Sequence, residues 1–182
     1  MPHISVPAAE LNTRLDRLRC AMTEKDPAWS MLLLDNTLDM YYFTGTMQDG
    51  ALVVTPDQAT LFVRRSFDVA KDESAFADIR PMGSFRGIKE VYPDIPETVY
   101  VAAKTMTLQK LSMLNKHLPF APKPMDGVLS ALRSVKSAYE LDCMRESGRL
   151  HRYVIEELAP AFLRKGVSEA RLCSEICTAI VD

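Results

Sequence analysis

The stretch GALVVTPDQATLFVR, residues 50–64, decides the fold of this chain. Two runs rich in β-forming residues, 50–55 and 60–64, flank the turn residues Pro56, Asp57 and Gln58. So short a connection favours an antiparallel hairpin, because a crossover between parallel strands needs a dozen residues or more. The sequence therefore predicts a β-hairpin at this place.

Helices and strands alternate on both sides of the hairpin. Before it, Leu11, Leu15, Leu18 and Met22 recur at helical spacing and predict an amphipathic helix that ends at Asp26-Pro27. The other predicted elements are strands at 29–34, 78–82 and 98–103, helices at 66–74 and 107–118, and one short helix between 83 and 97. In the helix at 107–118, three residues share the predicted buried face: Leu108, Leu111 and Leu114. This interleaving predicts an α/β domain with a mixed β-sheet flanked by helices.

The pattern changes at Ser137, where Ser137-Ala138-Tyr139-Glu140 forms a capping box that starts a long helix. We expect Pro160 to bend this helix and Gly166 to end it. Its predicted inward face consists of Leu141, Met144, Gly148, His151, Ile155, Leu158 and Phe162. Losing the partner of such an apolar face would leave an association site, so this face predicts a homodimer or a displaced helix.

A further helix begins at Ser168-Glu169 and shows no stop signal before the last residue, Asp182. From this we expect the natural chain to continue into a second domain. The expected domain boundary lies within residues 133–136, where strands cease and the two long helices begin.

Composition excludes several classes of protein. The 182 residues are 47% hydrophobic and 25% charged, which is typical of a globular chain rather than a disordered one. A net charge of −2 offers no positive field for nucleic acid, and no apolar run approaches the roughly 18 residues that span a bilayer. With no secretory signal and four scattered cysteines, the sequence predicts a cytoplasmic protein that binds neither nucleic acid nor membrane.

Few residues carry recognisable chemistry. The sequence has no Gly-rich phosphate loop, His-Glu-x-x-His, Gly-x-Ser-x-Gly or Cys-x-x-Cys motif. Cys173 and Cys177 could share a metal, but two more ligands would be needed, and buried small side chains on a helix are the simpler interpretation. Arg64 and Arg65 could receive a carboxylate through their forked donors, although solvated charge at a strand end is the default.

Three segments together resemble the N-terminal domain of the creatinase, prolidase and aminopeptidase P family. The first is NTLDMYYFTG at 36–45, followed by GALVV at 50–54 and LFVR at 61–64. The second, RSVKSAYEL at 133–141, is similar to the hinge of that family, and the third, GVSE at 166–169, is similar to its turn into the next helix. The resemblance covers essentially the whole chain.

The resemblance implies a creatinase/prolidase-like α/β domain over residues 1–133. Residues 134–182 would then be the hinge and the first two helices of a truncated pita-bread catalytic domain. In such enzymes that domain binds two divalent metal ions, manganese or zinc, through two Asp, one His and two Glu. None of these motifs is in the sequence, so we expect no catalytic residue and no metal ligand here. The resemblance then implies that the chain is an inactive piece of an Xaa-Pro aminopeptidase or dipeptidase.

In this family the N-terminal domain narrows access to the active site and helps to build dimers. By position, the loop at residues 46–49 would reach short proline-containing peptides, with Met47, Gln48, Arg64 and Arg65 at the substrate rim. Two alternatives remain open. One is a non-catalytic module of the same fold that binds peptides or proteins, and the other is a creatinase-like hydrolase of a small amidino compound.

Overall fold

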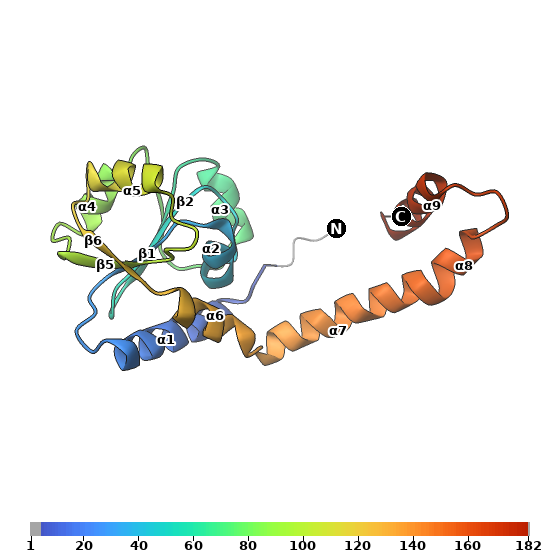
Figure 1. Cartoon of the computed structure of the whole chain (residues 1–182), viewed down its shortest axis with the longest axis horizontal. Helices are drawn as coiled ribbons and strands as arrows, with labels where there is room; N and C mark the ends of the chain where they lie inside the picture. The colour runs from blue at the N-terminus through green and yellow to red at the C-terminus, as the bar shows by residue number, and fades with distance from the viewer. Residues whose placement is uncertain (1–4, 182) are drawn as a thin grey trace. The chain divides into compact units, whose positions relative to one another are not determined.

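The computed structural model describes residues 5–181, which divide into two compact units between Val135 and Lys136 (Figure 1). The first unit contains every strand and the helices up to α6. The second unit contains only helices. Each unit is described by itself below.

The first unit is built on one six-stranded sheet in the order β4-β3-β2-β1-β5-β6. β2 runs antiparallel to both of its neighbours and the remaining pairs are parallel, so the predicted mixed sheet is confirmed. The strands are β1 (Leu32–Leu34), β2 (Gly50–Val54), β3 (Ala59–Val63), β4 (Ile79–Pro81), β5 (Thr98–Val101) and β6 (Ala121–Pro124).

The predicted hairpin is confirmed as β2 and β3. Their register pairs Gly50 with Val63 and Val54 with Ala59, and the amide of Thr55 donates to the carbonyl of Gln58 at 2.8 Å to close the turn. Every residue of β2 is buried, because it lies between β1 and β3 with helices over both faces of the sheet. The hairpin is therefore the interior of the sheet and not an edge.

Helices cover both faces of the sheet, with α4 and α5 over one and α1 and α6 over the other (Figure 1). Side chains alternate across a strand, so Leu33 and Phe62 face α4 and α5 in one core cluster with Ile88 and Leu114. The helices of this unit are α1 (Ala8–Lys25), α2 (Thr37–Thr44), α3 (Phe67–Glu73), α4 (Arg86–Val91), α5 (Leu108–Asn115) and α6 (Asp126–Ser134).

The predicted buried face of the helix at 107–118 is wrong at one residue. The structure exposes Leu108 by 86%, because it is the first residue of α5 and lies outside the packed part of the helix. The buried positions of α5 are Leu114 and, in part, Leu111. The predicted strand at 29–34 is also shorter, since regular pairing begins only at Leu32.

Three elements were not predicted, namely α2, β6 and α6. The helix α2 is buried on most sides and so lacks a polar stripe, but its ends are well marked. Asn36 caps it by accepting the amide of Asp39 at 2.9 Å, and Gly45 ends it in the left-handed conformation with φ of 74°. Strand β6 contains two prolines, which a sheet tolerates because β6 pairs only with β5 at an edge.

The second unit begins with the predicted capping box, which the structure confirms. The amide of Ser137 donates to Glu140 Oε2 at 2.8 Å, and the amide of Glu140 donates to Ser137 Oγ at 3.1 Å. The helical segments that follow are α7 (Ala138–Tyr153), the π-helical turn η1 (Val154–Leu158), α8 (Ala159–Phe162) and α9 (Glu169–Val181).

Pro160 distorts the long helix as expected. The amide of Ala159 donates to the carbonyl of Val154, five residues back, and Pro160 has no amide proton to continue the ladder. The helix ends at Phe162, short of the predicted Gly166, which adopts the left-handed conformation with φ of 85° in the turn that follows. The predicted absence of a stop signal at Asp182 lies outside the described residues.

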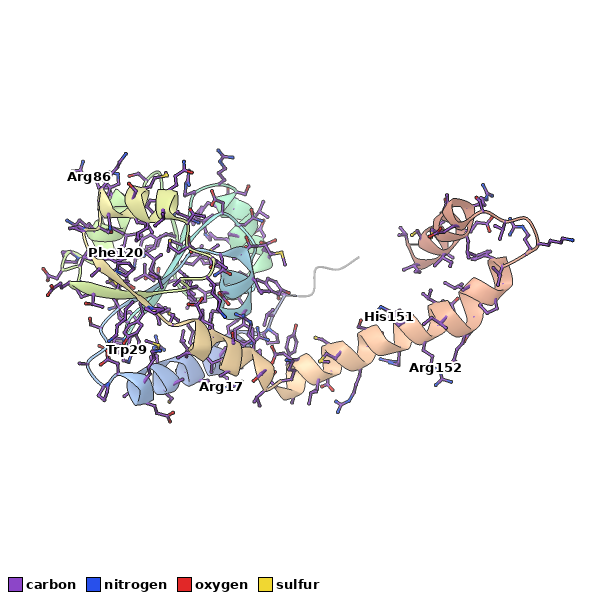
Figure 2. All side chains as sticks on the ribbon, viewed as in Figure 1. Arg17, Trp29, Arg86, Phe120, His151 and Arg152 are labelled. Atoms are coloured by element: carbon purple, nitrogen blue, oxygen red, sulfur yellow. The ribbon has the colours of Figure 1, made fainter. Side chains whose placement is uncertain are left out.

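The predicted inward face of α7 is largely exposed in this chain. Only Leu158 of that face is buried, and the exposed fractions of Leu141, Met144 and Ile155 are 40%, 56% and 68%. Figure 2 shows His151 and Arg152 projecting outward from α7. Among the described residues, no helix is long and apolar enough to cross a membrane.

An ion-paired cluster fastens the end of α1 to the sheet. Asp26 accepts hydrogen bonds from the hydroxyl of Tyr100 at 2.7 Å and from Lys123 Nζ at 2.9 Å, and its other oxygen accepts the amide of Ala28 at 3.1 Å. These donors, with Lys123 the strongest, lower the pKa of Asp26 from 3.8 to about 2. The cluster therefore favours the folded state only while the carboxylate is ionised.

We predict that Asp26→Asn lowers the free energy of unfolding at neutral pH. The folded pKa is depressed, so the contribution is fully present above pH 3.8 and is lost as the pH falls towards about 2. The stability difference between wild type and variant should therefore shrink across that window, as measured by urea unfolding at several pH values. A difference that stays constant from pH 5 to pH 2 would contradict this role.

Candidate functional site

The loop at residues 46–49 joins α2 to β2 and is held by one carboxylate. Glu73, the last residue of α3, accepts a hydrogen bond from Thr46 Oγ1 and another from Gln48 Nε2 at 3.2 Å. Thr46 is buried, whereas Met47 is 59% exposed. The loop therefore presents the Met47 side chain to solvent, while Glu73 holds the side-chain amide of Gln48.

Arg64 lies next to this loop because β3 ends beside the start of β2. Its amide donates to the carbonyl of Asp49 at 2.8 Å, and its guanidinium lies 3.8 Å from the Asp49 carboxylate. The structure thus brings Met47, Gln48 and Arg64 to one region of the molecule. Arg65 is exposed and makes no hydrogen bond or ion pair with any described residue.

Sequence reasoning missed Glu73, the residue that organises the loop. Glu73 is separated from Thr46 by two strands, and nothing in its local pattern distinguishes it from an ordinary acidic residue on a helix. The neighbouring Ser74 completes the anchor, since its hydroxyl donates to the carbonyl of Thr44. Only the tertiary structure reveals that α3 supports the loop.

Two ion pairs lie near the carboxyl end of β1. Lys110 Nζ is 2.8 Å from Asp35 Oδ2 and donates to the Asp35 carbonyl at 2.9 Å. Asp39 pairs with Arg133, and Asn36 Nδ2 donates to the other Asp39 oxygen at 2.6 Å. Both carboxylates are buried and paired with cations, so removing either cation would leave a buried charge unpaired.

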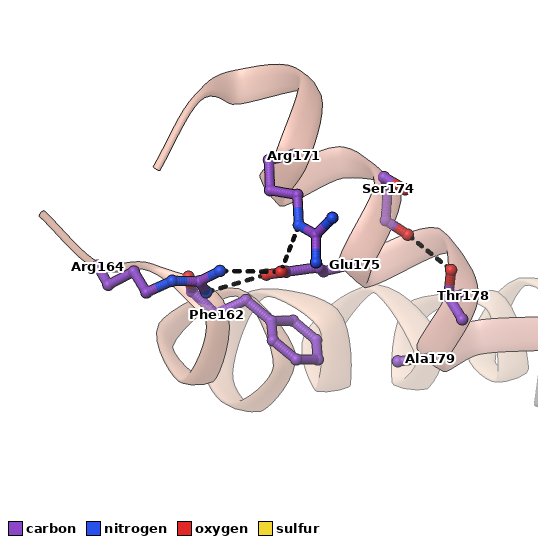
Figure 3. A pocket seen from close by; sticks show the side chains of 7 residues that line it. All are labelled: Phe162, Arg164, Arg171, Ser174, Glu175, Thr178 and Ala179. Atoms are coloured by element: carbon purple, nitrogen blue, oxygen red, sulfur yellow. Dashed lines mark hydrogen bonds and ion pairs between the residues drawn. The ribbon is translucent and has the colours of Figure 1, made fainter. Parts of the chain in front are cut away.

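The second unit contains a hollow of about 500 Å³ between α9 and the end of α8 (Figure 3). Arg164 holds Glu175 through two hydrogen bonds, at 3.0 and 2.9 Å, and Arg171 adds a third at 2.7 Å. Arg164 first and then Arg171 lower the pKa of Glu175 from 4.5 to about 2. Glu175 thus fastens α9 to the turn before it. All three of these charged side chains in the hollow are paired with one another.

The described residues do not fit a metal centre. No cluster of three or more His, Cys, Asp or Glu side chains that could hold an ion occurs between residues 5 and 181. The two cysteines of α9, Cys173 and Cys177, are free and exposed, so the simpler interpretation of them as buried side chains is wrong. They are exposed because nothing in this unit covers that part of α9.

Comparison with known proteins points to one family. Residues 14–135 match the model of the Creatinase/Prolidase N-terminal domain. No curated protein matches the sequence significantly.

Several solved structures share the fold. Dipeptidase PepE from Mycobacterium ulcerans is 26% identical with a TM-score of 0.76, over 98% of this chain and 51% of that one. The Xaa-Pro dipeptidase from Bacillus anthracis is 20% identical with a TM-score of 0.76, over 91% of this chain and 47% of that one. The Creatinase/Prolidase N-terminal domain of an X-Pro dipeptidase from Streptococcus pyogenes is 18% identical with a TM-score of 0.55, over 66% of this chain and 98% of that domain. The chain spans about half the length of the full-length enzymes among them.

Proposed function

From the premise that this chain belongs to the creatinase/prolidase N-terminal domain family, we propose that it is the accessory N-terminal part of an Xaa-Pro peptidase. The observation that carries the proposal is the family match over residues 14–135, together with a fold shared with Xaa-Pro dipeptidases and aminopeptidases. The chain by itself is not catalytic in this proposal. Residues outside it would bind any metal ion and cleave the peptide bond.

We propose that residues 1–133 are the accessory domain and that 134–182 are the hinge and first two helices of the catalytic domain. The exposed apolar side chains of the second unit support this division, because complete soluble proteins seldom expose so many of them together. They are Leu141, Met144, Leu150, Tyr153, Ile155, Leu163, Ile180 and Val181. In the parent enzyme these side chains would pack against the remainder of the catalytic domain or against a second subunit, which makes a homodimer our proposed assembly.

The substrate rim in this proposal consists of Met47, Gln48, Arg64 and Arg65. The loop at 46–49 is a suitable specificity element, because Glu73 and Thr46 fix its backbone while Met47 remains exposed. A preorganised loop loses little conformational entropy when a peptide binds. Its role would be to limit access to short proline-containing peptides.

We predict that Met47→Ala and Gln48→Ala in the complete parent enzyme each raise KM for Xaa-Pro peptides. The expected increase is about fivefold, with kcat nearly unchanged. It corresponds to the loss of about 1 kcal/mol of binding energy from contacts that stabilise the bound substrate and the transition state equally. Gln58→Ala is the matched control, because Gln58 lies in the exposed turn at the other end of β2 and β3. Steady-state kinetics on a panel of Xaa-Pro dipeptides and tripeptides provides the measurement.

Three outcomes would count against the proposal. Unchanged KM in both loop variants would remove Met47 and Gln48 from the rim while leaving the peptidase assignment standing. A parent protein that binds these peptides without cleaving them would instead favour a non-catalytic recognition module. Turnover of a small amidino compound and not of peptides would indicate a creatinase-like hydrolase.

A further inference from the structure

A groove lies on the α4 and α5 face of the sheet, beside the loop at 46–49, whose Asp49 contacts Arg64. It consists of two adjoining hollows of about 280 Å³ each, which share Arg64, Phe85 and Met113. One hollow continues to Ser84, Lys116 and His117, and the other continues along α5 to Lys110. We call this surface the Arg64 groove.

Strand geometry places the groove at the carboxyl edge of the sheet. Arg64 follows Phe62 by two residues, so both side chains face α4 and α5, and Phe62 belongs to the core beneath them. The segment from Gly83 to Phe85 follows β4, which runs parallel to β3. Open α/β sheets bind ligands in crevices outside the carboxyl ends of parallel strands.

The charges around the groove are unbalanced, although the whole chain has a net charge of −2. Lys116 Nζ and the ring of His117 make no hydrogen bond or ion pair with any residue between 5 and 181. Arg64 has one acidic neighbour, Asp49, at 3.8 Å, which is too long for a direct hydrogen bond. Two cations, Arg64 and Lys116, therefore border this hollow, and the one acidic neighbour of Arg64 does not hydrogen-bond to its guanidinium.

The floor of the groove is apolar. Phe85 is buried with 5% exposed, and Met113 is 42% exposed, so both contribute hydrocarbon surface between the cations. A guanidinium offers paired donors that match a carboxylate. Each hollow, at about 280 Å³, lies just below the usual range for ligand pockets, so only a small molecule would fit.

We propose that the Arg64 groove binds a small organic carboxylate whose apolar body lies on Phe85 and Met113. The carboxylate accepts hydrogen bonds from Arg64, and Lys116 adds electrostatic attraction. Inorganic phosphate fits less well, because it gains nothing from the apolar floor. Arg64 is shared with the proposed substrate rim, but the other residues of the groove are not, and the binding test below needs no peptidase activity.

The test is a titration of the 182-residue chain followed by the amide resonances in ¹H–¹⁵N spectra. The probe is benzoate, with benzamide as its uncharged counterpart, acetate as a carboxylate without an apolar body, and inorganic phosphate as a different anion. Benzoate should shift the amides of Gly83, Ser84, Lys116 and His117 with millimolar saturation, and the other three compounds should bind more weakly.

Two variants locate the contact. Arg64→Gln keeps a long polar side chain and should weaken benzoate binding about tenfold, as expected for the loss of one charge-assisted contact. Lys116→Ala should weaken it less, because an exposed ammonium contributes less. Lys89→Ala is the matched control, since Lys89 is an exposed lysine of α4 that lines neither hollow.

Several results would overturn the proposal. Equal binding of benzamide would show that the charge is not recognised, and equal binding of phosphate would assign the groove to anions in general. If Lys89→Ala weakened benzoate binding as much as Arg64→Gln, the binding would depend on the overall surface charge and not on a contact with Arg64. The absence of saturable shifts up to about 50 mM benzoate would exclude a site of this strength.

Discussion

Gly50→Ala is expected to lower the free energy of unfolding by about 3 kcal/mol, at the upper end of the cost of overpacking a core. A Cβ atom at this position would lie 2.0 Å from the carbonyl oxygen of Phe62, which belongs to the backbone of the neighbouring strand. Since β2 and β3 pair at this point in the middle of the sheet, the strands would have to separate. Chemical unfolding monitored by circular dichroism measures the change.

Gly127→Ala is the control for this prediction. Gly127 is exposed in the first turn of α6, and a Cβ there would meet no atom within 4 Å. Replacing an exposed helical glycine by alanine should stabilise the chain by up to about 1 kcal/mol. The two substitutions thus have opposite expected signs, and a neutral Gly50→Ala would mean that the strands adjust without cost.

The second large effect concerns the ion pair that fastens α6. Arg133→Ala should destabilise the first unit by about 3 kcal/mol, because it leaves the buried Asp39 carboxylate without its cation. The Asp39 side chain is only 6% exposed, and the pair joins the end of α6 to α2. Urea unfolding of the variant and the wild type gives the difference.

A double-mutant cycle separates the ion pair from other effects of the arginine. Asp39→Asn removes the buried charge, so Arg133→Ala should cost much less in the Asp39→Asn background. Arg80→Ala is the matched control: its pair with Asp78 is partly exposed and screened by solvent, so its loss should cost far less than that of Arg133. Strict additivity of the two substitutions in the cycle would show that the pair is not coupled.

Arg133 lies in the segment at the end of the first unit, residues 132–135. Besides Asp39, the segment is held by Arg17, which donates to the carbonyls of Leu132 and Val135 at 3.2 and 3.4 Å. The hydroxyl of Tyr42 also donates to the Leu132 carbonyl, at 3.4 Å. These contacts from α1 and α2 fix where the first unit ends, immediately before the second begins.

Elements specified by neighbouring residues could be predicted from the sequence. The hairpin depends on three turn residues between two β-rich runs, and α1 depends on a regular apolar stripe that ends at Asp26. The capping box at Ser137 is likewise a contact between residues three positions apart. In each case the signal and the structure it specifies lie within one or two turns of the chain.

The elements that could not be predicted depend on distant partners. Helix α2 packs against α1 and buries most of its residues, so it lacks the polar stripe whose periodicity identifies a helix. Strand β6 keeps its two prolines because only one of its edges is paired. Neither environment is visible until the sheet order is known.

The sequence by itself determined the hairpin, the amphipathic helices and the family resemblance, because each depends on local spacing or on a local motif. Only the tertiary structure decided that Glu73 holds the loop, that Arg133 pairs with Asp39, and that Arg64 borders a groove with Lys116. The physical reason is that sheet order and helix packing bring together side chains that are far apart in the sequence. Ion pairs and grooves form between such side chains, and their sequence positions alone do not show which of them will meet.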